Sequence, residues 1–258
     1  MDSFEDKDIL AVDLLKMLEL GSSNDVKIKL SDGEIDANKD ILVARSEYFA
    51  TMLSNSKFVE GKTSSVDMSH CSKAVMDKII KFLFSGAITF KDLSLPQLLE
   101  LSHMTEMMLL SKVKVKADRY LTLNIRRCGL EVKWFPELVT GLKLADKYKL
   151  DFNKSIIIQQ LHISLKHVPV DVQSSDSFKT LPFNMIREIL LLKVINHGFN
   201  DYVGRNLPTN KQRFQAFMVW LSQNENEITE EEKNEIVDSY DFEAFAVEES
   251  GTLAFIQT

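Results

Sequence analysis

Cysteine is scarce in this 258-residue chain: only Cys71 and Cys128 occur, far apart and in unrelated surroundings. Two isolated cysteines cannot form a disulfide framework, and such usage is typical of a reducing compartment. Long apolar runs are also missing, since no stretch approaches the ~20 residues that a membrane-spanning helix requires. The first residues, MDSFEDKD, are acidic and lack the basic and apolar parts of a secretory signal. We therefore expect a soluble cytoplasmic protein without a membrane partner, with the nucleus as the alternative location.

An excess of basic charge is absent too, because the formal net charge is −7 at pH 7. Proteins that bind nucleic acid concentrate Lys and Arg on one surface to contact phosphates. The short basic run KVKVKADR at 112–119 alternates with Val and Ala, which is more typical of a solvated helix face. The sequence therefore predicts no nucleic-acid partner.

Catalytic motifs are likewise missing. The chain has no Gly-rich phosphate loop, no Gly-x-Ser-x-Gly elbow and no HExxH metal motif. His70 and Cys71 are neighbours, but adjacent loop side chains cannot easily bind one metal ion, and no second ligand pair follows them. We expect a protein that is not an enzyme and that uses no cofactor or metal.

The first half of the sequence mixes helical and strand patterns. Apolar residues recur at helical spacing over 6–21, and 25–30 alternate with period two as a half-buried strand does. An Asp-Gly turn at 32–33 predicts a hairpin with 35–37. Further helices are predicted at 39–45, 46–53, 72–86, 94–104 and 106–125, and short strands at 66–68 and 87–90.

The second half is helical in pattern, with almost no strand signal. Thr229 and Glu232 have the spacing of a capping box. A change of character near 125–133 divides the chain into predicted domains at 1–125 and 126–258. The predicted helices of the second domain lie in 134–150, 153–168, 181–195, 210–223 and 229–240.

The first domain contains Asp25-Val26 on the first predicted strand and Ser46 with Tyr48-Phe49 after the hairpin. In this order these separated segments resemble a BTB (POZ) domain. The family usually carries Ala-His-Lys where this chain has Ala37-Asn38-Lys39, and an Asn can still form a local hydrogen bond there. The matching residues are Asp25-Val26, Ile41-Leu42, Ser46, Tyr48-Phe49, Met52-Leu53 and, in a later block, Phe82, Phe84, Ser85 and Gly86.

The second domain is similar to the BACK domain, a helical module that often follows BTB. Phe214, Ala216 and Trp220 match its Phe-x-Ala-x-x-x-Trp helix. The resemblance implies an α+β BTB/POZ domain, with helices around a small sheet, followed by an all-α BACK domain. No kelch repeats or MATH domain are visible, so the chain is either a fragment or a short natural member.

The same resemblance implies a binding site for cullin-3. BTB adaptors of this ubiquitin ligase carry a hydrophobic-x-Glu motif after the Tyr-Phe helix, and Phe58, Val59 and Glu60 fit it in type and position. An aromatic side chain that projects from the surface can fill a partner's pocket. Tyr48 and Met52 are expected to flank the contact. The alternative is that Phe58 packs under its own loop.

The resemblance also implies a homodimer, because the first BTB helix packs across a two-fold interface in the family. Such interfaces are usually apolar. The predicted helix at 6–21 is more apolar than a lone terminal helix needs, although packing onto its own domain explains part of this. The expected interface residues are Ile9, Leu10, Leu14, Leu15, Met17 and Leu18.

Together these features predict a dimeric adaptor that binds the N-terminal domain of cullin-3 and presents an unknown substrate protein to a RING-type E3 ubiquitin ligase. The helices at about 134–168 are expected to extend the cullin contact. A homo-oligomeric BTB–BACK scaffold unrelated to ubiquitin transfer is the alternative.

Overall fold

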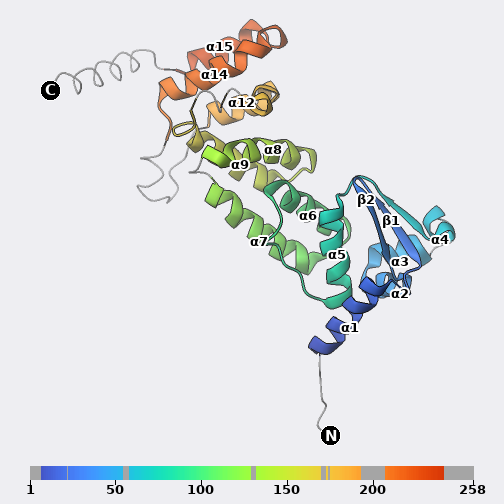
Figure 1. Cartoon of the computed structure of the whole chain (residues 1–258). Helices are drawn as coiled ribbons and strands as arrows, with labels where there is room; N and C mark the ends of the chain where they lie inside the picture. Colours follow the sequence, from blue (N-terminus) through green and yellow to red (C-terminus); the bar gives the residue numbers. More distant parts are fainter. Residues whose placement is uncertain are drawn as a thin grey trace. The chain divides into compact units, whose positions relative to one another are not determined.

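The computed structural model of the chain describes residues 7–21, 23–54, 58–128, 132–169, 173, 175–192 and 207–240. Contacts divide the chain into two compact units, Met1–Leu121 and Thr122–Thr258. The division falls inside one long helix, α7 (Ser111–Cys128), a few residues before the predicted domain boundary. Each unit is described by itself below, with the elements labelled in Figure 1.

The first unit combines a three-stranded sheet with several helices, as the sequence predicts. Its strands are β1 (Val26–Leu30), β2 (Gly33–Ala37) and β3 (Ser65–Met68). Besides the start of α7, its helices are α1 (Lys7–Leu20), α2 (Lys39–Arg45), α3 (Glu47–Ser54), α4 (Val59–Thr63), α5 (Lys73–Ser85) and α6 (Leu95–Met107).

Strand β1 occupies the middle of the sheet, in the order β2-β1-β3. It pairs antiparallel with β2, so that Ile28 lies opposite Ile35, and parallel with β3, so that Ile28 also lies opposite Val66. The sequence VKIKL buries every second side chain, as its period-two pattern predicts. The predicted hairpin is therefore confirmed, and β3 joins its open side.

Asn38 forms a local hydrogen bond, although the BTB pattern usually has a histidine at this position. Asn38 is the N-cap of α2, and its side-chain oxygen accepts a hydrogen bond from the Ile41 N–H at 3.1 Å. Its amide nitrogen donates to the Ser23 carbonyl at 2.8 Å. One Asn side chain thus fixes the start of α2 against the segment that precedes β1.

Two predicted elements of the first unit are wrong. Residues 87–90 do not form a strand, because the described sheet contains no partner for them. The predicted helix 106–125 is interrupted: Leu109 adopts the left-handed conformation with φ of 58°, and α7 begins only at Ser111. No Gly or Pro marks this break, so helical propensity alone could not reveal it.

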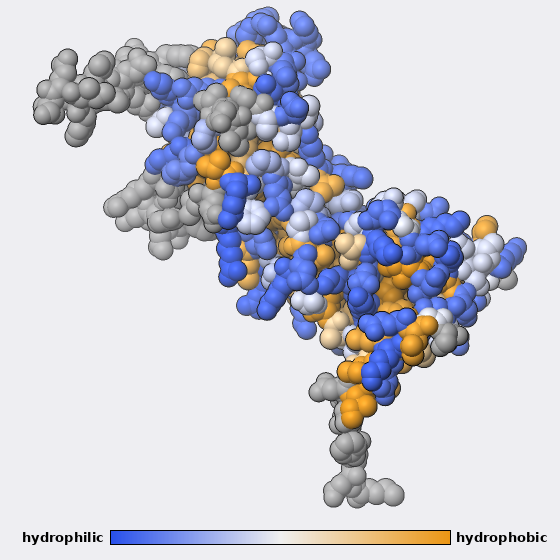
Figure 2. Space-filling model, in the orientation of Figure 1, coloured by the Kyte–Doolittle hydropathy of each residue, from blue (hydrophilic) through white to orange (hydrophobic). Residues whose placement is uncertain are grey.

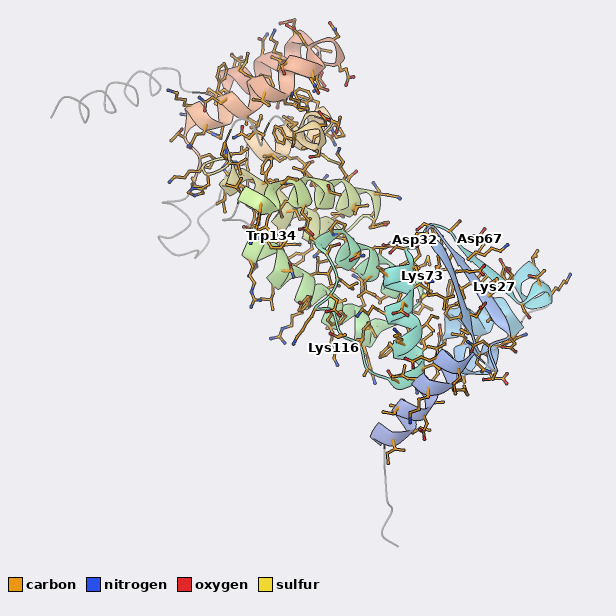
Figure 3. All side chains as sticks on the ribbon, in the orientation of Figure 1. Lys27, Asp32, Asp67, Lys73, Lys116 and Trp134 are labelled. Carbon is orange, nitrogen blue, oxygen red and sulfur yellow. The ribbon has the colours of Figure 1, made fainter. Side chains whose placement is uncertain are left out.

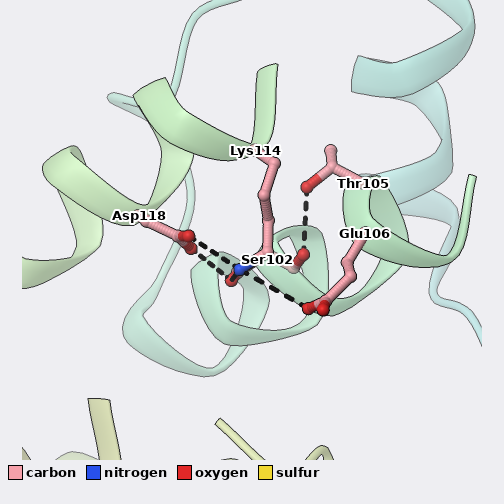
Figure 4. Close-up of polar contacts among 5 residues, drawn as sticks. All are labelled: Ser102, Thr105, Glu106, Lys114 and Asp118. Carbon is pink, nitrogen blue, oxygen red and sulfur yellow. Dashed lines mark hydrogen bonds and ion pairs between the residues drawn. The ribbon is translucent and has the colours of Figure 1, made fainter. Parts of the chain in front are cut away.

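A polar cluster holds α6 against the start of α7 (Figure 4). The hydroxyl of fully buried Ser102 donates to Asp118 Oδ1 at 2.5 Å. Lys114 Nζ donates to the same hydroxyl at 3.1 Å and to Asp118 Oδ2 at 2.7 Å. Glu106 lies 3.6 Å from the same ammonium. Buried polar groups that satisfy one another in this way fix the pairing of two helices.

The second unit contains only helices among its described elements, as expected of an all-α module. They are η1 (Val132–Trp134), α8 (Phe135–Lys147), α9 (Asp151–Ser164), α11 (Asp176–Lys179), α12 (Phe183–Leu190), α14 (Asn210–Asn224), η2 (Glu225–Glu227) and α15 (Glu230–Asp238). The capping box of Thr229 and Glu232 is present at the start of α15.

Buried polar side chains tie these helices together. Trp220 of α14 is almost fully buried, and its indole N–H donates to the Leu181 carbonyl at 2.8 Å. His162 of α9 lies 2.7 Å from the Ile189 carbonyl of α12 through Nδ1. Burial lowers the pKa of His162, so the ring is held neutral and donates this bond. Among the described helices, none has the length and apolar character needed to cross a bilayer.

We predict that Asp118→Ala lowers the free energy of unfolding by about 1–3 kcal/mol, because it leaves the buried Ser102 hydroxyl and Lys114 without their shared acceptor. Urea unfolding followed by far-UV circular dichroism measures this change. Asp77→Ala is the control, since it removes an exposed ion pair with Lys81 and should cost less than about 0.5 kcal/mol. Equal losses in the two variants would contradict the stabilising role of the cluster.

Candidate protein-docking site

Helix α4 is the element that places Phe58 at the surface. The sequence predicts no helix here, but Val59–Thr63 form a short one with Phe58 as its N-cap residue. α4 packs against α3 and β3 (Figure 1). Its far end is fixed by Ser64, whose left-handed backbone closes the helix and whose carbonyl accepts a hydrogen bond from Lys27 N–H of β1 at 3.0 Å.

The apolar side chains at the start of α4 are exposed. Phe58 is 42% exposed and Val59 is 69% exposed, and α4 has no buried residue. By contrast, Phe49 of α3 is fully buried. Large apolar side chains displayed together are a common mark of a protein-binding surface. This geometry favours display of Phe58 over packing beneath its own segment.

Tyr48 lies on the α3 side of the same region, half-buried. Its hydroxyl donates to the sulfur of Met68 at 3.2 Å, and its ring meets Phe49 edge to face at 5.5 Å. Burial raises the pKa of Tyr48, and the negative charge of Glu60 raises it further. The second effect indicates that the Glu60 carboxylate of α4 lies near the Tyr48 hydroxyl of α3.

Glu60 occupies the first turn of α4, where a carboxylate suits the positive end of a helix. Its side chain makes no hydrogen bond or ion pair within the part of the chain that the structure describes. The carboxylate is left for solvent or for a partner's donor.

Met52 stands one helical turn after Tyr48 on α3 and is half-buried. The predicted cullin-binding residues thus come from two helices in contact, with Tyr48 and Met52 on α3 and the other three at the start of α4. Sequence periodicity missed α4 because five residues containing a Gly give no recognisable apolar pattern.

The predicted dimer residues all lie on α1, which packs against α5. None of them is buried within the first unit: Ile9 and Leu10 are 58% and 61% exposed, and Leu14, Leu15, Met17 and Leu18 are half-buried. Apolar surface over α1 is visible in Figure 2. The part of α1 that its own unit leaves uncovered therefore includes large apolar side chains, beside the exposed charges of Asp13, Lys16 and Glu19.

No group of three or more His, Cys, Asp or Glu side chains among the described residues is placed to hold a metal ion. Cys71 and Cys128 are both buried, and they form no disulfide with each other. Burial, reinforced by the nearby Glu100 carboxylate, raises the pKa of Cys71 far above its ordinary value, which makes its thiolate unfavourable.

The display of Phe58 can be tested through stability. Phe58→Ala should change the free energy of unfolding by less than about 1 kcal/mol, because its side chain is already in contact with water. Phe49→Ala should cost about 3–5 kcal/mol, because it opens a cavity in the core. Urea unfolding of both variants gives the comparison, and a loss for Phe58→Ala that approaches that of Phe49→Ala would mean that Phe58 packs internally.

Comparison with known proteins identifies the first unit. A family model described as the BTB/POZ domain matches residues 14–118. Gigaxonin from human and from mouse is 24% identical over 200 residues, which is 77% of this chain and 29% of the relative. Human Rho-related BTB domain-containing protein 2 is 33% identical over 72 residues, or 28% of this chain and 10% of the relative. The chain thus spans less than a third of the length of gigaxonin.

Two solved structures are also similar. The BTB (Tramtrack and Bric a brac) domain of human gigaxonin is 22% identical with a TM-score of 0.37, covering 46% of this chain and 97% of that one. The BTB domain of zebrafish PATZ1 is 19% identical with a TM-score of 0.38, covering 47% and 98%.

Proposed function

The chain carries a BTB/POZ domain, and from this premise we propose that it is a dimeric, non-catalytic adaptor that binds the N-terminal domain of cullin-3. The adaptor joins an unknown substrate protein to a RING-type E3 ubiquitin ligase in the cytoplasm. The observation that carries this proposal is the exposure of Phe58 and Val59 at the start of α4, with the half-buried Glu60 directly after them.

The docking segment has the chemistry of a protein-binding anchor. Phe58 supplies a large rigid apolar surface, and Val59 extends it. Glu60, without an internal partner among the described residues, provides a charge that a Lys, Arg or amide on the partner can satisfy. Tyr48 and Met52 on the neighbouring helix widen the surface.

The second unit supports a BACK domain as the second part of the adaptor. Its described elements are all helical, and its first long pair, α8 and α9, pack closely on each other. The alignment with gigaxonin is longer than the first unit, so the similarity continues into the second. In this proposal α8 and α9 extend the cullin contact.

The dimer supplies two binding arms. A second copy that covers the exposed apolar residues of α1 removes them from water. This burial stabilises the dimer by about 25 cal/mol per Å² of apolar surface. A homodimer buries one patch against the same patch of its partner. Two arms on one particle raise the effective concentration at a bound substrate.

Phe58→Ala is expected to weaken binding to purified cullin-3 N-terminal domain by roughly 30-fold or more, because a central aromatic anchor is worth about 2 kcal/mol or more. Isothermal titration calorimetry measures the affinity. Met218→Ala is a matched control, because Met218 of α14 is an exposed apolar side chain of similar exposure, 46%.

The control should bind within about twofold of wild type, since Met218 of α14 belongs to none of the helices proposed to contact the cullin domain. Wild-type affinity in Phe58→Ala would contradict the role of this segment. A wild-type protein that does not bind the cullin domain at all would contradict the adaptor proposal itself.

The double variant Ile9→Asp, Leu10→Asp is expected to convert the dimer into a monomer, because a dimer would bury the two new carboxylates without partners. Light scattering coupled to gel filtration should give twice the 29.5 kDa chain mass for wild type and one chain mass for the variant. Val115→Asp, at another exposed apolar position, should remain dimeric. A monomeric wild type at micromolar concentration would contradict the dimer.

The second candidate function is a homo-oligomeric scaffold unrelated to ubiquitin transfer. The exposed apolar surface of α1 favours it equally, because this surface serves self-association with or without cullin-3. A wild type that is dimeric but does not bind the cullin domain would select the scaffold.

A further inference from the structure

A groove lies on the second unit between α9 and the end of α12, and its volume is about 670 Å³. We refer to it as the α9–α12 groove. Both helices are labelled in Figure 1, and their side chains are drawn as sticks in Figure 3. One wall is a single face of α9, because its residues recur at helical spacing, and the other wall is the last turn of α12 with the two residues after it. The lining residues of α9 include Asp151, Lys154 and Ile158, and the α12 side contributes Arg187, Glu188, Leu191 and Leu192.

Both cations of the groove are already held by carboxylates. Lys154 is mostly buried, and its Nζ donates to Asp146 Oδ1 at 3.0 Å and to Glu188 Oε1 at 3.3 Å. The Nε of Arg187 donates to Glu235 Oε1 at 2.8 Å. An anionic ligand would have to compete with these carboxylates for the two cations.

The carboxylates of the groove, in contrast, keep acceptor capacity. Asp151 is exposed and makes no hydrogen bond or ion pair within the described residues. It lies in the first turn of α9, where the positive end of the helix stabilises its charged form. Glu188 uses only Oε1 for Lys154, so that its Oε2 accepts no hydrogen bond from the described part of the chain.

Negative charge is therefore in excess at the groove. The lining residues and the partners of the two cations hold four carboxylates and two cations, a formal charge of −2. The carboxylates are those of Asp146, Asp151, Glu188 and Glu235, and the cations are Lys154 and Arg187.

The floor of the groove is apolar. Ile158 is buried, and Leu191 and Leu192 are half-buried. Phe152 adjoins the groove on α9, three residues before the lining residue Ser155, and is 66% exposed. The face of an aromatic ring attracts a cation. Apolar surface, free carboxylate oxygens and an exposed ring thus lie together.

This combination selects among cationic ligands. No three of the described His, Cys, Asp and Glu side chains are placed to hold a metal ion, and a metal ion would leave the apolar floor uncovered. A Lys or Arg side chain carries its charge at the end of an apolar stem, so it can satisfy the carboxylates and cover apolar surface together. An aliphatic residue next to it would cover the rest of the floor.

We propose that the α9–α12 groove binds a short basic segment of a partner protein, with one Lys or Arg against Asp151 and Glu188 and an aliphatic neighbour on the floor. The complementarity between the excess carboxylates and a cation with an apolar stem identifies the occupant. The proposal does not rest on the cullin-3 adaptor function, because the Phe58 segment belongs to the first unit and α12 is not among the helices proposed to contact the cullin domain.

Selection of random peptides displayed on phage against the full chain tests the preference directly. Enriched peptides should contain Lys or Arg beside an aliphatic residue. Fluorescence anisotropy then measures the affinity of one enriched peptide, made synthetically. The same peptide with Gln in place of its basic residues should bind at least about tenfold more weakly.

The double variant Asp151→Asn, Glu188→Gln should bind the enriched peptide at least about tenfold more weakly, because it removes both charges and keeps the size of the side chains. The control Glu225→Gln, Glu227→Gln changes the net charge equally at exposed positions of η2 and should bind within about twofold of wild type. Phe152→Ala should weaken binding by about threefold or more, because it removes the ring at the rim. Circular dichroism establishes that each variant is folded.

Phe58→Ala separates this proposal from the adaptor function. This variant should bind the enriched peptide as wild type does, whatever its affinity for cullin-3. Three results would overturn the proposal: selected peptides without Lys or Arg enrichment, no selected peptide at all, or equal binding by the two double variants. A fourth would be complete displacement of the peptide by the cullin-3 N-terminal domain, because the occupant would then be the cullin itself.

Discussion

The pairing of β1 with both of its neighbours is the constraint on which the first unit depends. β1 is the only described strand that bonds to two others, and its alternate side chains enter the core. The parallel pair with β3 brings together residues almost forty positions apart, and α2, α3 and α4 must fit within that connection. The hydrogen bond from Lys27 N–H to Ser64 then fixes the end of α4 against β1. The register of β1 against β3 therefore fixes where α4 lies, and with it the position of Phe58 at the surface.

Patterns with a clear period were predictive. VKIKL alternates without exception and forms the central strand, and the apolar spacing of 72–86 forms α5. The spacing of Thr229 and Glu232 also predicted the capping box correctly. The hydrogen bonds of a capping box join residues of one helix turn and need no tertiary partner. These elements are decided within a few residues of sequence, and this is why they can be read from it.

Elements decided by tertiary contacts could not be predicted in the same way. Residues 87–90 have strand propensity but find no partner in the described sheet, and a strand exists only through its partner. The break at Leu109 lies in the apolar run MMLL, where nothing local demands it. The exposure of Phe58 depends on α4 and on the contacts of this helix with α3 and β3. Such sites arise from packing rather than from any one motif.

The start of α7 has one more consequence, for insertions and deletions. Each residue of an α-helix turns it by about 100°, so the distance between Leu109 and Ser111 sets the rotational phase of every side chain that follows. One residue more or less would carry Lys114 away from Ser102 and Asp118 and would move the exposed charges of Lys112 and Lys116 to another face of the helix. A change of length at this point would damage stability and surface charge together. Substitutions in α7, in contrast, can alter either property alone.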